Sequence, residues 1–133
     1  MVMWLAAIDE RMKATVSSSF LTKMDQLEKN HCMCWKLPGL RELVDFSDIY
    51  SSIAPRALLC QNGLKEPPSQ FPVPIASEAM KEIKLIYQNF EQPKKVALVA
   101  HEGGHEVHLP SLLTFFEKHL GHHQSGAQPQ DSR

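Results

Sequence analysis

The sequence predicts an α/β fold in which about three parallel strands are flanked by helices. Three short and largely apolar runs have the length and composition of buried strands, at residues 12–20, 56–61 and 95–100. Residues 75–90, between the last two runs, carry an apolar stripe at helical spacing, which consists of Ile75, Ala79, Ile83, Ile86, Tyr87 and Phe90. Strands that alternate with helices form a parallel sheet through right-handed crossovers, so the loops after the strands should meet at one edge.

Each predicted strand has its own evidence. The first contains Thr15 and Val16, both β-branched, before a run of three serines. The second is apolar from Ala57 to Cys60 and ends at Asn62-Gly63, a pair that favours a turn. The third is an unbroken apolar run that starts at Val96, as expected of a strand buried on both faces.

The helices are predicted from apolar spacing and from end signals. Residues 75–90 form an amphipathic helix, and residues 110–120 form a closing helix with Pro110 in its first turn and Gly121 as its stop. Residues 47–53 have Ser47 as an N-cap and make about two helical turns before Pro55. Two further segments complete the expectation: residues 1–8 are the end of a helix, and residues 64–74, with four prolines, form a loop.

Composition bounds the class of protein. Fourteen Lys and Arg against fifteen Asp and Glu give no basic surface for nucleic acid or an anionic membrane. The apolar start runs into charged residues and is too short for a membrane span or a signal peptide, so we expect a cytoplasmic protein. Three cysteines are too few for a disulfide scaffold. Cys32 and Cys34 form one Cys-x-Cys without a second pair, which favours packing over a metal or redox site.

The chain is long enough for one domain, which we place at residues 1–121. Within it, residues 21–45 are irregular but contain Trp35 and Met33, which linkers rarely do, so this segment is interpreted as a lid or pocket wall. Residues 122–133 are polar and rich in Gln, Ser, Gly and Pro. They are predicted to be a disordered tail.

The third strand leads directly into the sequence His101-Glu102-Gly103-Gly104-His105-Glu106. The two glycines indicate a turn at the carboxyl end of the strand, where open α/β sheets place their chemistry. A histidine has an ordinary pKa close to neutral pH, so it can take and return a proton. His105 is therefore the first candidate for a catalytic base.

The same residues match H-E-x-x-H, the pattern of zinc peptidases, with His101 and His105 as ligands, Glu102 as base and His108 as a possible third ligand. That chemistry requires a helix. Here a strand runs directly into the motif, and two adjacent glycines cost about 2 kcal/mol of helix propensity relative to alanine. A zinc-dependent peptidase is therefore the weaker alternative.

Taken together, these motifs resemble the C-terminal portion of an α/β-hydrolase, in the branch of dienelactone-hydrolase-like and acetyl-xylan-esterase-like proteins. The resemblance covers nearly the whole chain up to Gly121. No single motif is specific, but the order and spacing of the set are. The segments that carry it are residues 5–14, 30–32 with 37–40, 53–59, 61–63, 71–73 and 101–106.

The resemblance implies roles for two residues. His105 falls on the family's catalytic histidine, and the acid that orients it normally follows the strand that ends here in Asn62-Gly63. The family usually has Asp followed by Pro at that place, whereas this chain has Glu66 followed by Pro67. No aspartate lies between Asp48 and Asp131, so Glu66 is the candidate acid from this loop.

The family's nucleophile is a serine in a G-x-S-x-G elbow, and this sequence contains no such motif. The resemblance therefore implies part of a serine hydrolase that acts on a small-molecule carboxylic ester through an acyl-serine, without a cofactor. We expect the isolated chain to be inactive. The alternative is a non-catalytic, truncated α/β-hydrolase that serves as a binding or regulatory module. No nucleic-acid or membrane partner is expected, but a three-stranded sheet would expose an edge through which the chain could self-associate.

Overall fold

The structure is a computed structural model that describes residues 2–31 and 37–121. Its sheet has three parallel strands in the order β1-β2-β3, and this confirms the predicted α/β class. The strands are β1 (Ala14–Ser18), β2 (Ala57–Gly63) and β3 (Val96–His101). All three predicted strands are present, with ends that differ by a few residues from the predicted ones. Register places Leu58 of the central strand between Thr15 and Val96.

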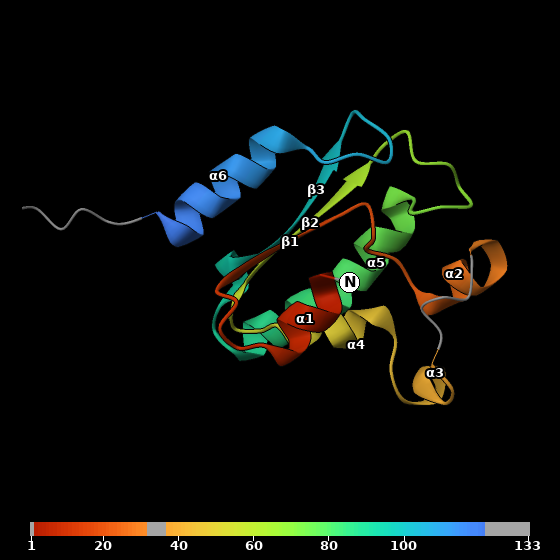
Figure 1. The fold of residues 1–133 in the computed structure, drawn as a ribbon, viewed down its shortest axis with the longest axis horizontal. Coiled ribbons are helices and arrows are strands. Elements are labelled where there is room, and N and C mark those ends of the chain that lie inside the picture. The colour runs from red at the N-terminus through yellow and green to blue at the C-terminus, as the bar shows by residue number, and fades with distance from the viewer. Residues whose placement is uncertain (1, 32–36, 122–133) are drawn as a thin grey trace, which may run out of the picture.

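Helices cover both faces of this sheet (Figure 1). On one side lie α1, α4 and α5, and on the other lies α6, while α2 and α3 extend away from the sheet. The helices are α1 (Val2–Ile8), α2 (Met24–Asn30), α3 (Leu40–Leu43), α4 (Phe46–Ser51), α5 (Val73–Asn89) and α6 (Leu109–Leu120), with a 3-10 turn at Pro93–Lys95 before β3.

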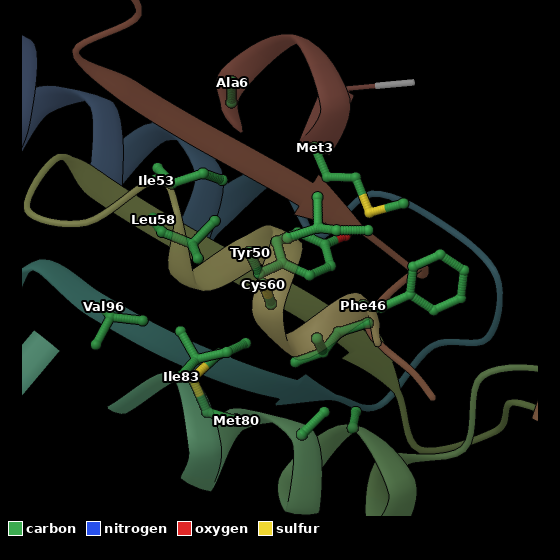
Figure 2. Packing of buried hydrophobic residues seen from close by; sticks show 14 of the residues in the cluster. Met3, Ala6, Phe46, Tyr50, Ile53, Leu58, Cys60, Met80, Ile83 and Val96 are labelled. Carbon is green, nitrogen blue, oxygen red and sulfur yellow. The ribbon is translucent and has the colours of Figure 1, made fainter. Parts of the chain in front are cut away.

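The main hydrophobic core lies between the sheet and the helices α1, α4 and α5 (Figure 2). The even-numbered residues Leu58 and Cys60 of β2 point into it, and both are fully buried. Tyr50 of α4 and Ile83 of α5 are also fully buried there. Because side chains alternate along a strand, the odd-numbered residues of β2 face α6 instead.

The long helix α5 confirms the predicted amphipathic segment, with two corrections. Pro74 belongs to its first turn rather than to the preceding loop, because a proline there loses no helical hydrogen bond. Ile86 and Phe90, predicted on the apolar stripe, are 36% and 53% exposed, so the buried stripe is narrower than predicted. It consists of Ala76, Ala79, Met80, Ile83 and Tyr87.

The start of α4 differs from the prediction in its capping residue. Asp45, not Ser47, is the N-cap, and its carboxylate accepts a hydrogen bond from the backbone N–H of Phe46 at 2.6 Å. Asp48 completes a capping box by accepting from the backbone N–H of Asp45 at 2.8 Å. Ser47 lies inside the first turn and is buried. The carboxylate pair satisfies more of the free N–H groups than a single hydroxyl could.

The segment predicted as a lid, residues 21–45, contains the two short helices α2 and α3. Leu21, Met24 and Leu27 are buried with the main core. Arg41 of α3 forms ion pairs with Asp25 and Glu28 of α2, and these ion pairs link the two helices. Cys32, Cys34 and the tail at residues 122–133 lie outside the described residues, and the lid role stays a prediction.

Within the described residues, β1 and β3 each pair with β2 alone, so each is an edge strand. Each outer strand thus has one side without a paired strand in the described sheet, whereas self-association through such an edge stays a prediction. No helix in the described ranges combines the length and the apolar character needed to cross a bilayer.

Candidate active site

The loops that follow β2 and β3 lie side by side at the carboxyl end of the sheet (Figure 1). Backbone hydrogen bonds join them at their first residues. The N–H of Leu64 donates to the carbonyl of His101 at 2.7 Å, and the N–H of Lys65 donates to the carbonyl of Gly103 at 2.9 Å. These bonds extend the β2–β3 pairing beyond the strand ends, so the two loops leave the sheet together.

Close approach of the two loops depends on Gly63, the last residue of β2. A Cβ atom at this position would overlap the backbone carbonyls of Gly103 and Gly104. Glycine is therefore required here for steric reasons, although its φ angle is ordinary. The loop after β3 carries His105 and is called the histidine loop below, and the loop after β2 carries Glu66 and is called the acid loop. Gly63, in the Asn62-Gly63 pair predicted to end the second strand, allows these two loops to approach each other.

The loops bring together the two residues predicted from sequence. His105 Nδ1 lies 2.9 Å from Glu66 Oε1, a hydrogen-bond distance. The Glu66 side chain is fully buried, whereas the His105 ring is 63% exposed. Because Nδ1 is held by the carboxylate, Nε2 of the ring is the nitrogen left for a reacting group. This acid–histidine arrangement is the one that orients a general base.

An aromatic side chain to which the sequence analysis assigned no role supports the imidazole. Phe71 is buried, and its ring centroid is 5.4 Å from that of His105. It also packs against Phe20 at 5.3 Å and against His31 at 5.0 Å. The His105 ring therefore has an apolar surface under it as well as a carboxylate beside it. In the sequence, Phe71 was noted only as part of the segment 71–73 that carries the resemblance.

The three consecutive serines at the end of β1 are each bound elsewhere. The Ser17 hydroxyl bonds Tyr50 at 2.5 Å, and the Ser18 hydroxyl donates to Gln61 at 2.7 Å. Ser19 has a left-handed backbone, with φ of 51°, and its hydroxyl is 3.5 Å from the carbonyl of Glu106. Among the described contacts none joins a serine to His105.

The geometry of the H-E-x-x-H segment does not suit a zinc peptidase. His101 ends a strand, and the residues after it are bends rather than a helical turn. Nδ1 of His101 accepts a hydrogen bond from the N–H of Gly103 at 3.2 Å, while Nδ1 of His105 is held by Glu66. In the described ranges no three His, Cys, Asp or Glu side chains gather as metal ligands. The zinc alternative is therefore not carried further.

Comparison with known proteins gives matches in structure only. No protein-family model matches the sequence, and a search among curated proteins finds no match. Among solved structures, a glucuronoyl esterase of carbohydrate esterase family 15 from Caldicellulosiruptor kristjansonii is similar at a TM-score of 0.75 and 14% identity, over 96% of this chain and 44% of that chain.

Two further structures agree with this match. The glucuronoyl esterase catalytic domain from Hypocrea jecorina aligns with 90% of this chain and 41% of its own, at a TM-score of 0.64 and 13% identity. A promiscuous esterase of the same family, from a marine bacterial metagenome, aligns with 89% of this chain and 38% of its own, at a TM-score of 0.66 and 13% identity. This chain thus spans less than half the length of these α/β-hydrolase-fold proteins. The chain has the fold of part of an α/β-hydrolase domain.

Proposed function

We propose that this chain supplies the acid and the base of a serine-type site that hydrolyses carboxylic esters. The observation that carries the proposal is the 2.9 Å contact between His105 Nδ1 and Glu66 Oε1, in loops after adjacent parallel strands. In this arrangement His105 is the general base and Glu66 orients it. The predicted likeness to an α/β-hydrolase and the fold of the esterase neighbours support the same reaction class.

The chemistry assigned to these residues is proton transfer. Nε2 of His105 removes the proton from an attacking serine hydroxyl as an acyl-serine forms, and then returns it to the leaving alcohol. Water then attacks the acyl-serine: Nε2 of His105 removes a proton from the water and returns it to the serine oxygen as the carboxylic acid leaves. The buried Glu66 carboxylate stabilises the imidazolium that forms in between, and shielding from water strengthens that interaction.

The serine in this proposal lies outside the residues 1–133, because the sequence has no G-x-S-x-G. We therefore expect the chain alone to leave p-nitrophenyl acetate unhydrolysed. A longer protein that contains both a G-x-S-x-G elbow and these 133 residues should react with a fluorophosphonate probe at the serine of the elbow. The first step of the test is to sequence the transcript upstream of Met1 for an in-frame elbow.

In such a protein the test variants are His105→Ala and Glu66→Gln. General-base catalysis contributes about 10²- to 10⁴-fold, so His105→Ala should lower kcat at the upper end of that range. Glu66→Gln should cost about a hundredfold, and Glu66→Asp should cost less because it keeps a carboxylate. Glu102→Gln is the matched control, since Glu102 is exposed in the same loop. Full activity in both His105→Ala and Glu66→Gln would contradict the proposal.

The substrate class proposed is a small-molecule carboxylic ester. Because two of the similar structures are glucuronoyl esterases, glucuronoyl esters are the first natural esters to try after p-nitrophenyl acetate. A likeness to dienelactone hydrolases and a cytoplasmic location are further proposals from the sequence. The alternative, a non-catalytic binding or regulatory module, is favoured by the missing elbow; a stop codon close upstream of Met1 would support it and would overturn the esterase proposal for this gene.

A further inference from the structure

Two consecutive amide side chains occupy the end of the central strand. Gln61 and Asn62 of β2 are both 0% exposed, although every earlier residue of that strand is apolar. Because side chains alternate along a strand, the two amides point to opposite faces of the sheet. Burying an amide costs free energy unless it is hydrogen-bonded, so a buried pair requires a compensating role.

The Gln61 amide is bound on every side. Its Oε1 accepts from the hydroxyl of Ser18 at 2.7 Å and from the backbone N–H of His108 at 3.2 Å. Its Nε2 donates to the carbonyl of His108 at 2.9 Å and to the hydroxyl of Ser111 at 2.8 Å. Both donors and both acceptor positions of the side chain are therefore used. Three of the four partners lie where the histidine loop enters α6.

The Asn62 amide serves the other loop. Its Nδ2 donates to the carbonyl of Phe71 at 2.9 Å and to the carbonyl of Leu21 at 3.2 Å. Its Oδ1 is buried and has no hydrogen-bond partner among the residues that the structure describes. Phe71 ends the loop that carries Glu66, and its ring is the surface under His105. The bond to its carbonyl therefore fixes both the acid loop and the support of the imidazole.

Hydrogen bonds thus hold the two loops at both of their ends. Their first residues are joined to each other through Leu64 and Lys65, as described above. Their last residues, His108 and Phe71, are joined to the same point of β2 through the two amides. Between these anchors lie His105 on one loop and Glu66 on the other. Reacting groups that are displaced by about 1 Å lose about a hundredfold in rate, so anchoring of this kind has a catalytic consequence.

We propose that Gln61 and Asn62 are positioning residues that set the alignment of His105 with Glu66 by holding the far ends of the two loops. The catalytic meaning of this proposal rests on the function proposed above, whereas the alignment itself can be measured without any substrate. The hydrogen bonds of the two amides go to Ser18, His108 and Ser111 and to Leu21 and Phe71, not to His105 or Glu66, so their effect acts through the loops.

The first test is an NMR measurement on the chain itself. The hydrogen-bonded Nδ1 proton of His105 should give a downfield resonance that Glu66→Gln removes, which also assigns it. The near-isosteric variants Gln61→Met and Asn62→Leu should broaden or lose this resonance. Leu58→Ala is the matched control, because Leu58 lies on the same strand in the core and should lower stability while keeping the signal. An unchanged resonance in folded Gln61→Met and Asn62→Leu would overturn the proposal.

A milder variant keeps the proposal testable if the apolar replacements do not fold. Ser111→Ala removes one partner of Gln61 at the loop end, and Ser18→Ala removes one on β1. Ser111→Ala should weaken the resonance more than Ser18→Ala does. Equal behaviour of the two would contradict a role in holding the loop.

The second test uses the serine-containing protein. Gln61→Met and Asn62→Leu should each lower kcat by about ten- to a hundredfold with KM changed by less than threefold, because alignment rather than binding is disturbed. Leu58→Ala should keep kcat below its unfolding temperature. If the wild-type protein lacks esterase activity and the NMR signal is still lost in the two variants, the proposed function fails and the positioning role stands. Normal kcat in both variants would overturn the positioning role.

Discussion

On one face of the sheet, α1, α4 and α5 enclose large side chains such as Tyr50, Phe46 and Ile83, all fully buried. On the other face α6 is the helix that packs over the described strands, and the buried residues there are Ala57, Leu59 and Phe115. Leu113 of α6 is 63% exposed, and a groove of about 410 Å³ lies along this helix. The first face therefore provides most of the apolar burial in this part of the fold.

The difference between the faces also explains how the site is held. The main hydrophobic core, on the side of α1, α4 and α5, is called the deep core here. The acid loop packs on the deep core through Phe71, while the histidine loop continues into helix α6, which buries few side chains. Polar contacts through Gln61 compensate for the few apolar contacts at the start of α6. We therefore expect substitutions to act differently on the two faces.

The largest expected effect is a difference between two neighbouring leucines of β2. Leu58 is fully buried in the deep core, and Leu59 is 2% exposed under α6. Leu58→Ala should lower the free energy of unfolding by about 4 kcal/mol and Leu59→Ala by about 2 kcal/mol, because the thinner layer can relax around the cavity. Urea denaturation of both variants measures this. Equal losses would show that the faces contribute equally.

The second prediction concerns a polar contact inside the deep core. The hydroxyls of Ser17 and Tyr50 are 2.5 Å apart and buried, and burial raises the pKa of the Tyr50 phenol. Tyr50→Phe leaves the Ser17 hydroxyl without this partner, so it should cost about 2 kcal/mol of unfolding free energy. Ser17→Ala combined with Tyr50→Phe should cost less than the sum of the single changes. Additive losses in the double-mutant cycle would rule out the coupling.

The prediction from the strand edge concerns association. In the described sheet β1 pairs with β2 alone, so one side of its backbone has no strand beside it. An exposed edge favours pairing with another chain. Sedimentation velocity over a range of concentrations should show reversible self-association of the chain. A single monomeric species at every concentration would contradict it.

The sequence was informative where local chemistry decides the structure. Apolar runs located all three strands, and the resemblance paired His105 with Glu66 from two loops 39 positions apart in the chain. The roles proposed for Gln61 and Asn62 were not visible in the sequence, because Asn62 followed by Gly63 is a common turn signal. The proposed roles depend on contacts with His108 and Phe71, which lie 47 residues from Gln61 and 9 residues from Asn62 in the sequence.

The capping of α4 and the narrow stripe of α5 show a second limit. Ser47 and Asp45 are both good N-cap residues, and the choice depends on Asp48 being placed to complete the box. Phe90 fits the helical period of α5, but it is the C-cap after the last helical residue, Asn89, and is 53% exposed. Periodicity predicts which side of a helix is apolar, whereas tertiary packing decides how much of that side is buried.

The smallest expected effect is a pH dependence of the α6 face. Burial, together with Lys118 and Lys95, lowers the pKa of His119, whose ring is 4.6 Å from that of Phe115. The folded state then binds the proton more weakly than the unfolded state, so stability should fall as the pH drops below the ordinary histidine pKa of about 6.5. His119→Gln should flatten this part of the stability curve. Urea midpoints on either side of that pH measure the change for wild type and variant.

The control for this prediction lies on the deep-core face, which has no described histidine in α1, α4 or α5. Leu58→Ala should therefore shift the whole curve of stability against pH without changing its slope. A slope that persists in His119→Gln would place the titrating group elsewhere and would remove this distinction between the faces.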